Sequence, residues 1–83
     1  MNFNDFCTTM FDLLEREPII VSENTVLRDD LDVDSLQMVN LATSLADHYL
    51  IPFSLFIEKA DKIGTVGGLF EIVKEGATYE VIQ

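Results

Sequence analysis

The chain has 83 residues and a formal net charge of −10, from 15 acidic and 5 basic residues. At this length we expect one domain, residues 1–83, and the charge disfavours nucleic acid as a partner because it repels phosphate backbones. No apolar run reaches the roughly 20 residues of a membrane span, so we expect no stable membrane insertion. Cys7 has no second cysteine to pair with and the N-terminus lacks a secretory pattern, which predicts a cytoplasmic protein.

The first predicted helix covers about residues 2–16 and ends before Pro18. Its apolar residues recur at intervals of three and four, as an amphipathic helix requires; they are Phe3, Phe6, Cys7, Met10, Phe11, Leu13 and Leu14. From residue 17 to residue 33 no regular period persists. We expect a long ordered loop here, because several apolar residues can anchor it to the core: Ile19, Ile20, Val26, Leu27 and Leu31.

A second helix, at about residues 35–50, is predicted as the central element, with Pro52 marking its end. Its apolar face consists of Leu36, Val39, Leu41, Ala42, Leu45, Ala46 and Tyr49. A less regular helix at about 55–62 follows, and then a last helix at about 65–75 with Gly76 as its stop. Gly67 and Gly68 weaken that helix by about 1 kcal/mol each relative to alanine, which indicates close packing or local mobility there. The tail, 77–83, has no predicted conformation.

The start of the second helix follows a run of carboxylates, Asp29, Asp30, Asp32 and Asp34. If Asp34 caps the helix, Gln37 stands at its third position, which gives a capping box and leaves the hydroxyl of Ser35 free. If Ser35 caps it, the third position is Met38, which cannot reciprocate. A serine in the first turn lies where unpaired N–H groups and the helix dipole favour a phosphate ester.

The stretch from Leu31 to Leu36, Leu-Asp-Val-Asp-Ser-Leu, resembles the attachment motif of acyl carrier proteins, Leu-Gly-x-Asp-Ser-Leu before a long helix. The similarity covers most of the chain. It implies an all-α fold, a small four-helix bundle of the acyl-carrier-protein type with a long loop between the first and second helices. It also implies that Ser35, flanked by Asp34 and Leu36, carries 4′-phosphopantetheine, on which acyl intermediates are held as thioesters.

The resemblance implies partners and two further sets of residues. The partners are a phosphopantetheinyl transferase and acyl-loading and acyl-processing enzymes with basic docking patches, and we expect the carrier to be a monomer. An acyl chain would lie between the second and third helices, at Val39, Leu45, Phe53, Ala60 and Ile63, for each of which ordinary core packing is the alternative. The docking positions are Asp30, Asp32, Asp34, Gln37, Asn40 and Asp47.

Three departures from the family pattern bear on the function. Asp32 stands where the family usually has glycine, which raises the question of whether the backbone there adopts a positive φ; Asp tolerates one better than most residues. The second helix has few exposed acids, Asp47 being its main charge, and residues 53–57 are more apolar than the family norm. These departures indicate a specialised carrier in a dedicated lipid or polyketide-type biosynthetic pathway rather than the general fatty-acid carrier.

Enzymatic and metal chemistry fit the sequence less well. His48, the only histidine, follows Ser35 on the same predicted helix at about 20 Å along its axis, whereas a Ser-His pair needs about 3 Å. Cys7 lies on the apolar face of the first helix, where an inert thiol is expected. Asp30, Asp32 and Asp34 alternate as the acids do at the start of a calcium-binding EF-hand loop. Ser35 and Leu41, however, occupy the positions where that loop requires glycine and glutamate. We therefore expect no catalytic residue and no metal site.

Three functions other than an acyl carrier stay open at this stage. An unmodified acidic helical interaction module would use the same fold to dock a basic partner. A peptidyl or aminoacyl carrier would use the same serine with a different cargo. A protein that binds free lipid noncovalently would use only the apolar residues.

Overall fold

The computed structural model describes the backbone of residues 1–81 and the side chains of residues 1–77. The prediction of an all-helical class is confirmed, since the described residues form helices and turns with no strand, apart from an isolated bridge between Val26 and Thr65. The elements are α1 (Phe3–Leu13), α2 (Leu27–Leu31), α3 (Ser35–Tyr49), α4 (Phe53–Glu58), the 3-10 turn η1 (Ala60–Lys62) and α5 (Val66–Val81). Within residues 1–81 no helix combines the length and apolar character needed to cross a bilayer.

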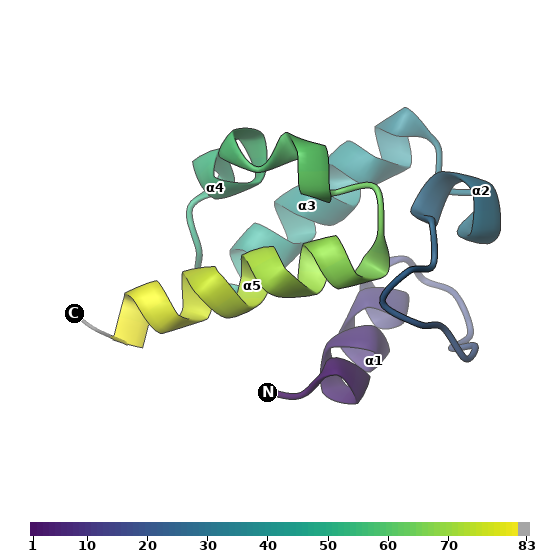
Figure 1. The fold of residues 1–83 in the computed structure, drawn as a ribbon, viewed down its shortest axis with the longest axis horizontal. Coiled ribbons are helices and arrows are strands. Elements are labelled where there is room, and N and C mark those ends of the chain that lie inside the picture. Colours follow the sequence, from purple (N-terminus) through teal and green to yellow (C-terminus); the bar gives the residue numbers. More distant parts are fainter. Residues whose placement is uncertain (82–83) are drawn as a thin grey trace.

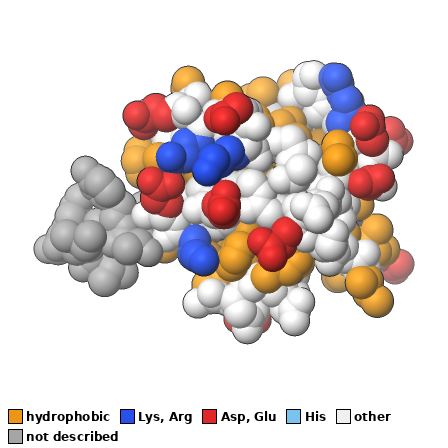
Figure 2. Space-filling view, viewed as in Figure 1, with side chains coloured by type: hydrophobic (Ala, Val, Ile, Leu, Met, Phe, Trp, Pro, Cys, Tyr) orange, Lys and Arg blue, Asp and Glu red, His pale blue; other side chains and the backbone are white. Residues whose placement is uncertain are grey.

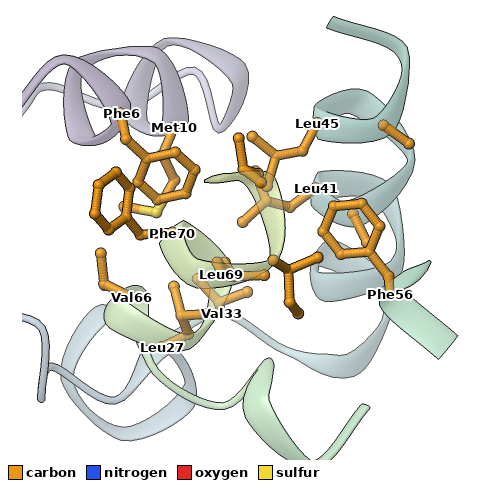
Figure 3. Packing of buried hydrophobic residues seen from close by; sticks show 14 of the residues in the cluster. Phe6, Met10, Leu27, Val33, Leu41, Leu45, Phe56, Val66, Leu69 and Phe70 are labelled. Carbon is orange, nitrogen blue, oxygen red and sulfur yellow. The ribbon is translucent and has the colours of Figure 1, made fainter. Parts of the chain in front are cut away.

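The helices pack around a core at the centre of the molecule. α3 and α5 lie against each other and both contact α1, while α4 covers one end and α2 stands at the opposite side (Figure 1). Figure 3 shows the buried side chains pointing inward from these helices, with the ring of Phe6 near that of Phe70 at 5.6 Å between centroids. The most deeply buried large residues include Phe6, Met10, Phe11, Leu27, Leu45, Leu69 and Ile72.

The long connection after α1 contains a short helix that the sequence did not predict. α1 ends at Leu13, earlier than expected, and Glu15 adopts a left-handed conformation with φ 58°. The N–H of Leu27 donates to the carbonyl of Gly64 at 3.0 Å, and the N–H of Val66 donates to the carbonyl of Thr25 at 3.0 Å. These bonds join the chain at the start of α2 to the chain that leads into α5.

The prediction that five apolar residues anchor this connection to the core is only partly correct. Leu27 and Leu31 are buried and Val26 is half-buried, whereas Ile19 is 58% exposed and Ile20 is fully exposed. The anchoring role predicted for these two isoleucines is therefore wrong. The neighbouring Val21 packs against the core instead.

The last helix is longer than predicted, because Gly76 does not stop it. α5 continues to Val81, so part of the predicted tail at 77–83 is helical, and residues 82–83 lie outside the described residues. A Cβ atom on Gly76 would lie 2.5 Å from Cγ2 of the buried Ile51. Gly76 therefore gives room for a side chain of another segment. A glycine inside a helix weakens it by about 1 kcal/mol relative to alanine, and tertiary packing can override that preference.

Candidate functional site

The candidate site is the start of α3, where the capping arrangement is the one predicted. Asp34 is the N-cap: its carboxylate accepts from the N–H of Gln37 at 2.8 Å, and the Gln37 side chain accepts from the N–H of Asp34 at 3.1 Å. Ser35 is therefore the first residue of α3, and it is exposed. With the cap supplied by Asp34, the Ser35 hydroxyl is not needed to satisfy the end of the helix.

The turn that leads into α3 depends on Asp32. This residue adopts a left-handed conformation, φ 55° and ψ 40°, at the end of α2, so the position where acyl carrier proteins usually have glycine does take a positive φ here. The guanidinium of Arg16 donates to the carbonyl of Leu31 and, at 3.4 Å each, to the carbonyl of Asp32 and the side-chain oxygen of Gln37. Arg16 thus links the end of α1 to the turn and to the first turn of α3.

The Ser35 hydroxyl has a partner that the sequence did not predict. The Nη2 atom of Arg28 donates a hydrogen bond to Oγ of Ser35 at 3.1 Å. The expectation that this hydroxyl is free is therefore wrong, although it is exposed. The physical reason is that α2 and the left-handed Asp32 turn the chain back, so that a residue seven positions earlier reaches the start of α3.

The surroundings of Ser35 are strongly acidic. The carboxylates of Asp29, Asp30, Asp32 and Asp34 all belong to exposed residues. Figure 2 shows acidic side chains beside basic ones on the side of the molecule where α2 meets the start of α3. Among the described residues no carboxylate is within ion-pair distance of the Arg28 guanidinium, which instead contacts Ser35.

The predicted docking residues are all exposed, and two apolar neighbours join them. Asp30, Asp32, Asp34, Gln37, Asn40 and Asp47 lie at the surface of α2, α3 and the turn between them. The predicted apolar face of α3 included Leu36 and Val39, but they are 71% and 55% exposed. The buried stripe of α3 is narrower than predicted and consists of Leu41, Ala42, Leu45 and Ala46. The first two turns of α3 thus present apolar as well as polar side chains to solvent.

The residues predicted to shelter an acyl chain lie in different environments. Leu45 is fully buried in the core, Ile63 is half-buried against it, and Ala60 is exposed. Val39 and Phe53 are exposed, Phe53 by 40%. Four hollows on the described surface are lined by other residues; the largest of these, about 600 Å³, lies between α4 and α5. The acyl cleft therefore stays a prediction.

His48 and Cys7 both lie in places that do not favour a nucleophilic role. His48 is exposed in the last turn of α3, with its ring edge-on to that of Tyr49 at 4.8 Å. Cys7 is half-buried against the core, and this burial raises the pKa of its thiol. A thiol that holds its proton more tightly is a weaker nucleophile at neutral pH.

Arg16 and Arg28 contact the candidate site, and neither was among the predicted site residues. The sequence does contain a signal for them, since they are the only two arginines in an acidic chain, one just before the connection that leads to Ser35 and the other within it. No family model matches the chain, and no solved structure gives a significant match to it. What the site offers chemically is an exposed hydroxyl at the N-terminus of a long helix, with one cation in contact and several anions around it.

Proposed function

We propose that this chain is an acyl carrier protein that carries acyl intermediates as thioesters on a 4′-phosphopantetheine arm attached to Ser35. The observation that supports the proposal most is the position of Ser35. It is the exposed first residue of α3, and the capping of the helix is supplied by Asp34 and Gln37. Its hydroxyl can be esterified without loss of that capping box.

The residues around Ser35 fit a phosphate ester on its hydroxyl. The first turn of a helix carries unpaired N–H groups and the positive end of the helix dipole, both of which favour an anion. Arg28 adds a positive charge in direct contact with the hydroxyl. The nearby aspartates oppose this attraction, but they are exposed, so solvent and salt screen their repulsion. When bound, the prosthetic group would supply a terminal thiol for thioester formation.

The surface beside Ser35 supports docking of partner enzymes. Exposed carboxylates of α2 and the turn would attract basic patches on a phosphopantetheinyl transferase and on acyl-loading and acyl-processing enzymes. Leu36 and Val39 add exposed apolar contact area next to the attachment point. Apolar side chains within a polar rim are the usual composition of a protein interface.

The same surface supports a specialised pathway in lipid or polyketide-type biosynthesis. α3 carries few acids on its exposed face, so partner recognition would depend on Leu36, Val39 and the neutral Gln37 and Asn40 as well as on charge. The exposed Val39 and Phe53 are the proposed contacts of the acyl chain near the surface. Leu45 would contact it only after the core beside α3 opens, because it is now fully buried.

The test is intact-mass measurement after incubation with a phosphopantetheinyl transferase and coenzyme A. The proposal predicts a gain of about 340 Da, the mass of the prosthetic group, in the native chain and no gain in Ser35→Ala. Ser54→Ala is the matched control, because Ser54 is also exposed and also lies in the first turn of a helix, α4. A gain that survives in Ser35→Ala, or is lost in Ser54→Ala, contradicts the assignment of the attachment site.

An unmodified interaction module is the second candidate, and the Arg28 contact favours it. A hydroxyl that accepts a hydrogen bond from Arg28 already has a local structural role. In that case transferases of broad tolerance would leave the mass unchanged. A peptidyl or aminoacyl carrier would gain the same mass, and it would differ only in accepting amino acids rather than acyl groups from loading enzymes.

A further inference from the structure

We propose that Arg28 is the residue that holds the phosphate of the group attached to Ser35, as a positioning residue for the arm. This inference rests on the proposed function. The guanidinium of Arg28 would pair with the phosphodiester and fix its orientation at the start of α3. It would also offset the repulsion between the added charge and the aspartates around it.

The contact between Arg28 and Ser35 places the cation at the atom that would be esterified. Nη2 of Arg28 is 3.1 Å from Oγ of Ser35, and the phosphorus of the prosthetic group would be bonded to that same oxygen. An ester oxygen is a poorer acceptor than the charged oxygens of a phosphate. The planar guanidinium has several N–H donors and pairs well with phosphate, so we expect it to move from Oγ to the phosphate oxygens.

The backbone holds Arg28 in place. α2 is fixed to the core by Leu27 and Leu31, which are buried, and to the segment just before α5 through the hydrogen bond from Leu27 N–H to the carbonyl of Gly64. The N–H of Val33 donates to the carbonyl of Leu27 at 3.0 Å and closes the turn after α2. Arg28 itself is exposed, so its side chain can adjust while its backbone stays fixed.

The charges nearby leave Arg28 available for this role. Four aspartates stand close in sequence, yet within the described part of the chain none forms an ion pair with Arg28. The first and second residues after it, Asp29 and Asp30, are exposed, and Asp30 accepts from the N–H of Val26 at 2.7 Å. A guanidinium without a carboxylate partner has more to gain from a new anion than one already paired.

The test measures the melting temperature of each protein before and after attachment of the prosthetic group. The proteins are the native chain and the variants Arg28→Gln, Arg28→Lys and Lys62→Gln. Lys62→Gln is the matched control, since it removes the same charge from an exposed residue whose ion pair is with Glu71. Modification of Arg28→Gln is expected to lower the melting temperature by about 4 °C more than modification of the native chain does. Arg28→Lys is expected to restore part of the difference, and Lys62→Gln to behave as the native chain.

A role confined to the fold would shift the modified and unmodified forms of Arg28→Gln equally, and that result overturns the inference. The ³¹P resonance of the phosphodiester gives a second readout, expected to move in Arg28→Gln and to stay in place in Lys62→Gln. An unmoved resonance in Arg28→Gln also overturns it. If the native chain gains no mass with any transferase, the proposed function fails and this inference fails with it. If the mass is gained but the melting shifts are equal, this inference alone fails.

Discussion

Asp34 and Gln37 cap α3 reciprocally, each side chain accepting a hydrogen bond from the backbone N–H of the other, at 2.8 and 3.1 Å. This capping box stabilises the helix that carries Ser35. Because a lost N-cap costs about 1 kcal/mol, Asp34→Ala should lower the free energy of unfolding by about that amount in urea denaturation. Asp47→Ala is the control: it removes an equal charge from the other end of α3 and should change stability by less than about 0.5 kcal/mol. Equal losses in the two variants would show that the box contributes nothing.

The glycines in α5 and the one just before it differ in the room around their Cα atoms, and the stability of the alanine variants should follow that order. A Cβ on Gly68 would collide with the carbonyl oxygen of Lys62, which is backbone and cannot rotate away; on Gly76 it would lie 2.5 Å from Ile51. A Cβ on Gly64 would meet nothing within 4 Å. We expect Gly68→Ala to cost about 3 kcal/mol or more and Gly76→Ala about 1–2 kcal/mol, whereas Gly64→Ala should be nearly neutral. Thermal denaturation, monitored by circular dichroism, ranks the stabilities of the three variants. A Gly76→Ala variant more stable than the native chain would contradict the close packing of Gly76 against Ile51.

Local chemistry predicted much of this fold and part of the site. The capping box at Asp34 and Gln37 depends on residues three apart, so it could be read directly from the sequence, and the 3.6-residue period located α1 and α3. The five-residue α2 is too short to show such a period. The prediction that Gly76 ends the last helix is wrong because its contact with Ile51 joins two segments far apart in sequence, which a local pattern cannot show. The bond from Arg28 to Ser35 likewise depends on how the loop turns back at Asp32.

Leu36 and Leu41 belong to the same helix but differ in exposure, so substitutions at the two positions can distinguish an effect on partner docking from an effect on fold stability. Leu36 is 71% exposed and Leu41 only 2%. Leu36→Ala should leave the free energy of unfolding within about 0.5 kcal/mol, whereas Leu41→Ala should lower it by about 2–4 kcal/mol. If Leu36 contacts the transferase, its loss should also reduce kcat/KM for phosphopantetheinylation about tenfold. An unchanged kcat/KM would remove Leu36 from the docking surface.

The thiol of Cys7 should react slowly in the folded protein and its reactivity should shift to higher pH. Burial raises its pKa, so the pH at which alkylation by iodoacetamide is half-maximal should be higher in the folded chain than in urea. By linkage, the stability from this shift is present below the pKa of the unfolded thiol and is lost as pH rises through that of the folded thiol. Cys7→Ala should lose that part of the pH dependence. Identical alkylation profiles in the folded and unfolded chains would contradict the burial of Cys7.

The most direct test is the mass of this protein isolated from the cells that make it. The carrier proposal predicts a mass about 340 Da above that of the unmodified chain, or more where an acyl group is attached, with the addition mapped by peptide fragmentation to Ser35. Ser35→Ala expressed in the same cells should have the unmodified mass. A native chain found only at the unmodified mass under conditions of active biosynthesis would contradict the proposal.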